Sequence, residues 1–136
     1  MNRRGSLHHL ELWMDDATTP QGPWPWLLTR LGYTVDNVWA TGCAWASGEA
    51  YVVLESGRDH IRGRHERLHS GMNHVAFRAG SRDELDLLVA DAPRHGWSLM
   101  FTDRHPHAGG PHTYAAYLED PHGFEVELVA DELEFP

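Results

Sequence analysis

The first half of the chain opens with a stretch in which hydrophobic and polar positions alternate. In LHHLELWM (7–14), Leu10 and Leu12 face one way and His9 the other, which is the pattern of a half-buried β-strand. WPWLLTRLGY (24–33) predicts a short helix, because proline stands near its start and glycine near its end. Three short β segments separated by glycine-containing turns follow: 34–42, 43–48 and 49–56. The first half therefore reads β-α-β-β-β.

The second half repeats this order. MNHVAFRAG (72–80) alternates as a strand, and SRDELDLLVADAPRHG (81–96) predicts a helix that opens on a capping box of Ser81 and Glu84. His74 stands 65 residues after His9, near the start of the first strand of its half. Three further strands are predicted: 97–103, 113–120 and 123–130.

The repeat predicts an α+β fold built from two tandem βαβββ modules. Module one spans 7–56, a polar linker spans 57–71 and module two spans 72–130. Each module is too small to close a core alone, so we expect the pair to form one domain over 1–136. The expected architecture is a cupped, eight-stranded mixed sheet with the helices outside.

Composition narrows the class of protein. An apolar fraction of 41% with six Trp indicates a folded chain, and a net charge of -9 without a basic stripe argues against nucleic-acid partners. Cys43 is the single cysteine, which fits a reducing compartment, and no apolar run is long enough to span a bilayer. These features predict a cytoplasmic protein with no membrane partner.

The strand 123–130 buries one face and presents carboxylates from the other, since Glu125 and Glu127 alternate with apolar residues. Together with His9 and His74, Glu127 would face the cup. Two imidazoles and one carboxylate on stiff strands form a facial set that binds a divalent first-row metal and leaves positions open for substrate.

The chain resembles the vicinal oxygen chelate superfamily, which contains glyoxalase I, extradiol dioxygenases, fosfomycin-resistance enzymes and bleomycin-binding proteins. The matching segments are HHLELWMDD, LLTRLGY, NHVAFRAGS and YLEDPHGFEVEL, and the resemblance spans about residues 7–130. It implies metal ligands at His9, His74 and Glu127. It also implies a homodimer.

Resemblance to glyoxalase-like members implies a fourth ligand, a Glu on the last strand of module one. Val53 stands at that position, and Glu55 lies two residues further on the same strand face. Glu55 could replace the missing ligand, act as a catalytic base beside the metal, or be a solvated carboxylate at the strand end. Glu11 and Glu125 could hydrogen-bond a ligating His, or simply be solvated at the rim.

The loop DRHPHAGGPH (103–112) offers His105, His107 and His112, with Gly109 and Gly110 as hinges. It could be a lid that excludes water and recognises substrate, or a polar surface loop. Aromatic residues could line the apolar part of a pocket or pack in the core: Trp13, Trp39, Trp45 and Tyr114.

A rival motif, HERLH (65–69), matches the H-E-x-x-H pattern of zinc peptidases. That pattern needs a buried helix, whereas this segment is rich in arginine and is flanked by Gly63 and Gly71. We therefore reject a peptidase. A phosphate-binding loop, a dinucleotide fingerprint and a C-x-x-C pair are missing from the sequence.

The leading hypothesis is a metal-dependent lyase, isomerase or dioxygenase-type enzyme. Its divalent metal (Fe, Zn, Ni, Mn or Co) would chelate two neighbouring oxygens of a small substrate. The alternative is a metal-free protein that binds and sequesters a small molecule such as an antibiotic, as some members of the superfamily do. Fold alone does not choose between these functions.

Overall fold

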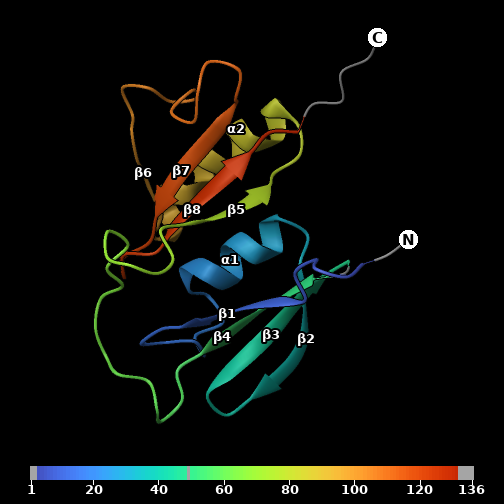
Figure 1. The fold of residues 1–136 in the computed structure, drawn as a ribbon, viewed down its shortest axis with the longest axis vertical. Helices are drawn as coiled ribbons and strands as arrows, with labels where there is room; N and C mark the ends of the chain where they lie inside the picture. Colours follow the sequence, from blue (N-terminus) through green and yellow to red (C-terminus); the bar gives the residue numbers. More distant parts are fainter. Residues whose placement is uncertain (1–2, 49, 132–136) are drawn as a thin grey trace. The chain divides into compact units, whose positions relative to one another are not determined.

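The structure, a computed structural model, describes residues 3–48 and 50–131. Its contacts divide the chain into two compact units, with the boundary between Gly63 and Arg64 (Figure 1). The first unit contains β1 (His9–Trp13), α1 (Pro23–Arg30), β2 (Thr34–Trp39), β3 (Gly42–Ser47) and β4 (Ala50–Glu55). The second contains β5 (Val75–Arg78), α2 (Arg82–Asp91), the 3₁₀ turn η1 (Ala92–His95), β6 (Ser98–Leu99), β7 (Ala115–Glu119) and β8 (Glu125–Val129).

The first unit is a four-stranded mixed sheet in the order β1-β4-β3-β2. β1 pairs with β4 in parallel, and the other neighbours pair antiparallel. Proline at the start of α1 sets its first turn, and Gly32, with φ of 92°, lets the chain leave the helix. Leu27 and Leu28 of α1 are fully buried, as is Leu54 of β4, so this helix face closes the core of the unit.

The second unit repeats the plan, with strand order β5-β8-β7-β6 and one parallel pair, β5 with β8. α2 lies across one face of this sheet (Figure 1). Its buried Leu85 and Leu88 belong to the same core as Val126 and Leu128 of β8, all less than 4% exposed. The predicted α+β fold of two tandem modules is confirmed.

Two elements differ from the predicted ranges. β6 has only two residues, because Phe101 adopts a positive φ of 53° and ends the extended backbone. β5 begins at Val75, so His74 lies immediately before the strand. Glu49, at the start of one predicted β segment, lies outside the described residues.

Hydrogen bonds hold the predicted linker 57–71 at two places along its length. Asp15 accepts hydrogen bonds from His60 Nε2 (2.8 Å) and from the backbone N–H of Gly63 (3.1 Å), which fixes the first part to the first unit. Beyond Gly63, the backbone N–H of His65 donates to the carbonyl of His122 (2.8 Å). The boundary between the units therefore falls inside the predicted linker.

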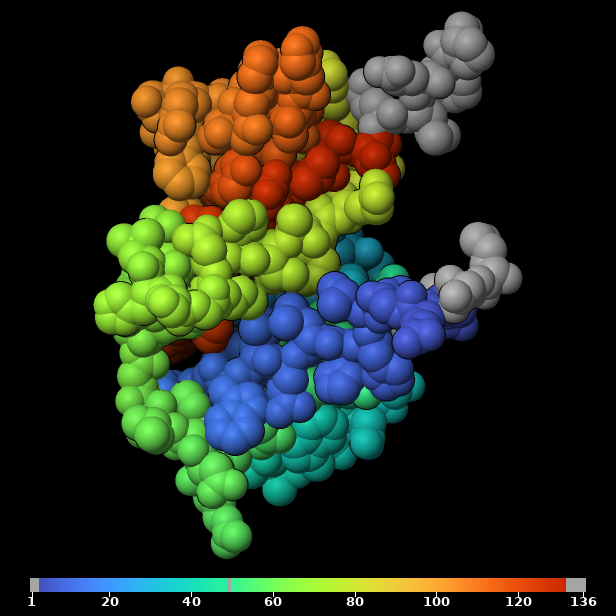
Figure 2. All heavy atoms as spheres, in the orientation of Figure 1, coloured from blue at the N-terminus to red at the C-terminus, as the bar shows by residue number. Residues whose placement is uncertain are grey.

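The loop between β6 and β7, coloured orange, lies at the surface of the second unit (Figure 2). Within the described part of the chain, no helix is both long enough and apolar enough to cross a membrane.

Candidate functional site

His74 and Glu127 meet in the second unit. His74 precedes β5, Glu127 lies on the neighbouring β8, and the His74 Nε2 atom is 3.2 Å from Glu127 Oε1. The two side chains are 32% and 14% exposed, so both can be reached from solvent. Two ligands bound to one first-row metal at about 2 Å lie roughly 3 Å apart, so this pair fits two adjacent coordination positions.

The other ring nitrogen of His74 is held by Asn73. The Asn73 amide N–H donates to the backbone carbonyl of Arg67 (3.1 Å), which turns Asn73 Oδ1 toward His74 Nδ1 (2.7 Å). An amide oxygen only accepts, so Nδ1 must carry the ring proton in this contact. Nε2, which faces the Glu127 carboxylate, is then the ring nitrogen on the side where a metal could bind.

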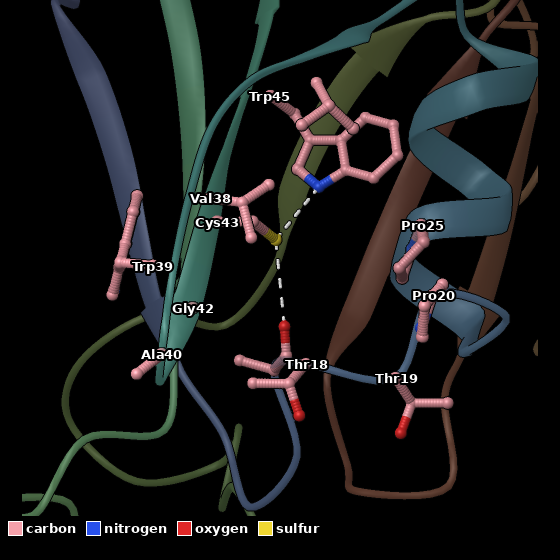
Figure 3. A pocket seen from close by; sticks show the side chains of 12 residues that line it. Thr18, Thr19, Pro20, Pro25, Val38, Trp39, Ala40, Gly42, Cys43 and Trp45 are labelled. Atoms are coloured by element: carbon pink, nitrogen blue, oxygen red, sulfur yellow. Dashed lines mark hydrogen bonds between the residues drawn. The ribbon is translucent and has the colours of Figure 1, made fainter.

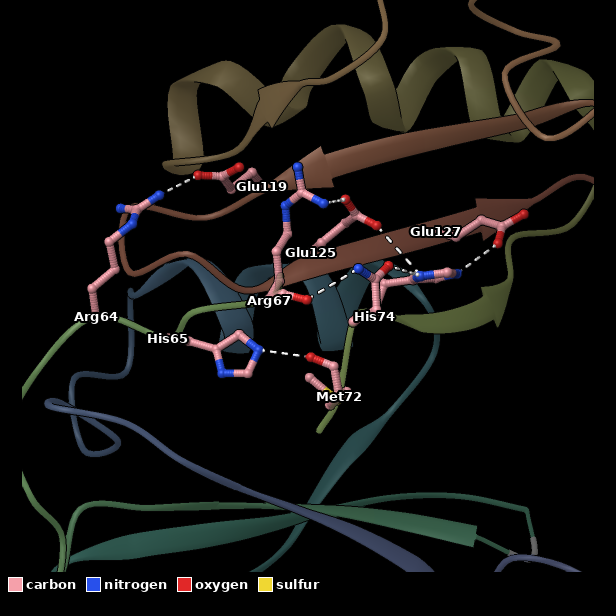
Figure 4. A network of polar contacts seen from close by, with 9 residues as sticks. Arg64, His65, Arg67, Met72, His74, Glu119, Glu125 and Glu127 are labelled. Carbon is pink, nitrogen blue, oxygen red and sulfur yellow. Dashed lines mark hydrogen bonds and ion pairs between the residues drawn. The ribbon is translucent and has the colours of Figure 1, made fainter. Parts of the chain in front are cut away.

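Glu125 lies beside the same ring (Figure 4). Its Oε2 is 3.4 Å from His74 Nδ1 and its Oε1 is 3.3 Å from Arg67 Nη1. The residue is 2% exposed, and burial raises its pKa while Arg67 and His74 oppose that rise. The prediction that Glu125 contacts a candidate ligand is thus supported, although Glu125 is buried and does not lie at a solvated rim.

Tyr117, on β7 directly opposite Glu127, closes another side of the pair. Its hydroxyl hydrogen-bonds Glu127, and burial, followed by the negative charge of Glu127, raises the pKa of Tyr117. The Phe101 ring packs edge-on against Tyr117, with centroids 5.4 Å apart. A Cβ on Gly109 would come 2.9 Å from the Tyr117 hydroxyl oxygen, so the loop 103–112 approaches Tyr117 closely at that glycine.

The residues described here contain no group of three or more His, Cys, Asp and Glu side chains that could hold a metal ion. Two carboxylates do meet the His74 ring, but at different nitrogens. Glu125 faces Nδ1 and Glu127 faces Nε2, so a cation bound to Nε2 beside Glu127 cannot also be bound by Glu125. His74 and Glu127 could supply two ligands to a metal, and a third would have to come from elsewhere.

His9, the third predicted ligand, belongs to the first unit. Its ring stacks on Tyr51, the residue opposite it on β4, with centroids 4.7 Å apart. His9 Nδ1 is also 2.9 Å from His8 Nδ1, which leaves Nε2 outside that contact. That His9 joins His74 and Glu127 on one ion stays a prediction.

The strand register identifies the position in module one that corresponds to Glu127. Glu127 pairs with Ala76, two residues after His74, and Val53 pairs with Glu11, two residues after His9. Val53 therefore occupies the equivalent place, as the sequence indicated.

Glu55 is held at the end of β4 by two side chains. Trp39 Nε1 donates to Oε2 (2.6 Å), and the Thr41 hydroxyl donates to Oε1. These bonds, that from Thr41 above all, lower the pKa of Glu55, which makes the carboxylate a weak base. Glu55 is thus a hydrogen-bonded rather than a merely solvated carboxylate at the strand end, and its role as a ligand or base stays a prediction.

The first unit also holds a cavity of about 180 Å³, between the segment 17–20, the start of α1, and strands β2 and β3 (Figure 3). Trp39 and Trp45 contribute to its walls, and their place in a substrate pocket beside the metal stays a prediction. Trp45 pairs with Val52 and so lies on the sheet face opposite to His9. The cavity is therefore separate from the face that carries the predicted ligand.

Other predicted site residues have local partners. Trp13 Nε1 donates to Glu11 Oε2 (2.6 Å), so Glu11 is engaged by its own strand. The Tyr114 hydroxyl donates to Asp86 of α2 (2.7 Å), and His107 Nδ1 lies 2.8 Å from the carbonyl of Thr113. A lid role for the loop 103–112 stays a prediction.

The rejection of a peptidase site agrees with the structure. Residues 65–69 are not helical, and His65 stacks on Phe124 while its Nε2 lies 2.9 Å from the carbonyl of Met72. His65 is thus used to pack the segment against the β7–β8 turn. In that turn the buried Asp120 accepts hydrogen bonds from the backbone N–H groups of His122 and Phe124.

Sequence reasoning overlooked Asn73, Arg67 and Tyr117. The turn before β8 fixes the antiparallel register, so counting outward from it places Tyr117 opposite Glu127. An Asn directly before a candidate ligand is a weaker signal for Asn73. No sequence signal locates Arg67, because its contact with Glu125 depends on how the linker folds back.

Two bacterial proteins are similar to this chain over most of its length, one compared by sequence and one by structure. The chain is 34% identical over 125 residues to the uncharacterized protein YqjT of Bacillus subtilis (strain 168), covering 91% of this chain and 98% of that protein. A putative glyoxalase from Bacillus halodurans superposes with a TM-score of 0.86 at 37% identity, covering 95% and 98% of the two chains.

More distant structures share the fold. A glyoxalase/bleomycin resistance protein from Albidiferax ferrireducens T118 has a TM-score of 0.72 at 17% identity, covering 93% of this chain and 98% of its own. Lactoylglutathione lyase from Agrobacterium tumefaciens has a TM-score of 0.62 at 16% identity, covering 95% of each chain. No family model matches the sequence. The extent and level of these similarities show that the chain belongs to the glyoxalase/bleomycin resistance/dioxygenase family, the vicinal oxygen chelate superfamily.

Proposed function

We propose that this protein is a metal-dependent enzyme in which His74, Glu127 and His9 hold a divalent cation that chelates two neighbouring oxygens of a small substrate. The observation that carries the proposal is the pair formed by His74 Nε2 and Glu127 Oε1, 3.2 Å apart. Asn73 occupies the other ring nitrogen, so Nε2 is the atom left for a metal.

When bound, a divalent cation would supply Lewis-acid stabilisation of negative charge that develops on a substrate oxygen. The protein's own part is orientation. Tyr117 donates to Glu127 and keeps that carboxylate directed at His74, while Phe101 packs against Tyr117. A raised pKa keeps the Tyr117 phenol protonated, and its single proton is the one donated to Glu127.

The donor chemistry of nitrogen and carboxylate oxygen suits Fe, Zn, Ni, Mn or Co. Iron would accompany ring-cleaving oxygenation, and the other metals would accompany isomerisation or lyase chemistry.

The proposal includes a homodimer, which light scattering tests directly. Glu55 is not given the proton-transfer step, because its two hydrogen-bond donors weaken it as a base.

The test is metal content. Purified protein loaded with each metal and desalted should retain about one ion per chain, and His74→Ala should retain almost none because it loses a ligand. His69→Ala is the control, since His69 is exposed and lies in the non-helical segment after β4. Equal retention by wild type and His74→Ala would refute the site.

The metal-free alternative needs a pocket for a drug-sized molecule. The cavity in the first unit, at about 180 Å³, is smaller than the roughly 300–1,000 Å³ of such sites. That cavity therefore does not favour sequestration over catalysis.

A further inference from the structure

Two ion pairs connect the segment 64–71 to the last two strands of the second unit (Figure 4). Arg64 pairs with Glu119 of β7, and Arg67 pairs with Glu125 of β8. Glu119 and Glu125 are direct partners in the β7–β8 ladder, so the pairs lie side by side. Each pair joins an arginine of this segment to a glutamate of the β7–β8 ladder.

The two pairs differ in burial and in what they touch. In the first, the Arg64 and Glu119 side chains are 53% and 26% exposed. In the second, Arg67 and Glu125 are 24% and 3% exposed, and Glu125 also reaches His74 Nδ1 at 3.4 Å. The buried pair alone touches a proposed metal ligand.

A buried carboxylate is costly unless it is fully paired. Glu125 Oε1 is buried and has no hydrogen-bond partner among the residues described, and its nearest cation, Arg67 Nη1, stands at 3.3 Å. A hydrophobic residue would fill this position of β8 at lower cost. The position of the carboxylate at the Nδ1 edge of the His74 ring points to a role in orienting His74.

We propose that Glu125, held in place by Arg67, is a positioning residue for His74: together with Asn73 it keeps the proton on Nδ1 and directs Nε2 at the metal. This inference rests on the proposed metal site. A carboxylate behind a ligating imidazole fixes its tautomer and increases its basicity, and the loss of such a partner typically weakens metal binding about 10- to 100-fold. Arg67 makes the segment between the modules part of the site.

The experiment compares the two ion pairs. Glu125→Gln and Arg67→Met are the test variants, and Glu119→Gln and Arg64→Met are the matched controls. The dissociation constant for Zn²⁺ is measured by competition with a chromophoric chelator. We expect this dissociation constant to rise about 10- to 100-fold in Glu125→Gln and by a smaller factor in Arg67→Met. In both controls it should stay within about twofold of wild type. Arg67→Lys should restore most of the affinity that Arg67→Met loses.

The second readout is the tautomer of His74 in metal-free protein, taken from the ¹⁵N chemical shifts of its ring. Wild type should show a proton on Nδ1, facing Asn73 and Glu125, and Glu125→Gln should show a proton on Nδ1 in a smaller fraction of the molecules. This measurement does not depend on metal binding. It also separates orientation of the ring from a general loss of stability.

The outcomes distinguish the two proposals. If wild-type protein binds no Zn²⁺ yet holds the Nδ1 proton and loses that preference in Glu125→Gln, the proposed function fails and the positioning role stands. If Zn²⁺ binds and Glu125→Gln leaves both affinity and tautomer unchanged, the positioning role is wrong. Equal loss in the Glu119 and Glu125 variants would also overturn it. If Glu125→Gln does not fold, the ring proton of His74 in wild type and the Zn²⁺ affinity of Arg67→Met test the positioning role instead.

Discussion

At the scale of single residues, Glu55 shows how neighbours decide the chemistry of a carboxylate. The indole N–H of Trp39 and the hydroxyl of Thr41 both donate to it, and they stabilise its charged form. Its pKa lies below the ordinary value of 4.5, with the bond from Thr41 as the largest cause. Glu55 therefore contributes to stability as a charged hydrogen-bond acceptor.

The pH dependence of that contribution is testable with Glu55→Gln. A carboxylate whose folded pKa is depressed stabilises the protein above its unfolded pKa and loses this effect as the pH falls through the folded value. We expect the variant to be less stable by about 1 kcal/mol at pH 7, with partial exposure reducing the effect. The difference should shrink as the pH falls below 4.5. Thermal unfolding at several pH values measures it, with the exposed Glu66→Gln as control; a difference that persists at low pH would contradict the assignment.

Some residues of the candidate site could be predicted from sequence and others could not. Alternation along the last strand, with the repeat and the family resemblance, singled out His74 and Glu127. Asn73 and Arg67 act through tertiary contacts that carry no periodic signal. The side-chain environment of Glu125 was similarly hidden, because alternation predicts its face but not the segment that covers it.

At the scale of elements, α2 begins where its capping box predicted. The Ser81 hydroxyl accepts from the backbone N–H of Glu84 (3.1 Å), and the Glu84 carboxylate accepts from the backbone N–H of Ser81 (3.3 Å). Local chemistry of this kind is readable from sequence because all partners lie within three residues. β6 is the opposite case, since the left-handed backbone at Phe101 has no local signal.

Removing the cap should destabilise the second unit. Ser81→Ala leaves the backbone N–H of Glu84 without its side-chain acceptor and breaks the reciprocal cap, at a cost of about 0.5–2 kcal/mol. Urea unfolding followed by circular dichroism measures this loss. Ser47→Ala, at the exposed end of β3, should change stability by much less. A Ser81→Ala protein as stable as wild type would show that the cap contributes nothing to this helix.

At the scale of the whole molecule, the tandem order of the elements was predictable because each strand and helix carries its own period or punctuation. The register within each sheet follows from the turns and from the parallel pairing of β1 with β4 and of β5 with β8. The division of the linker at Gly63 was not predictable, because it depends on Asp15 and on the β7–β8 turn as anchors.

A ligand that binds only the folded chain raises its unfolding temperature. At a free concentration about one hundred times the dissociation constant, a bound divalent metal should add about 2.7 kcal/mol, an increase on the order of 10 °C for a chain of this size. Scanning fluorimetry with and without chelator measures the shift, and Glu127→Gln should abolish most of it. An equal shift in both proteins would place the stabilising ion elsewhere.

Val53 and Glu127 occupy matching places in the two repeats, and only one of them is an acid. The halves thus share a backbone plan and a histidine at its start, but not this carboxylate. Doubling the plan has not doubled the carboxylate, so a metal site that uses a glutamate at this place can form at most once per polypeptide.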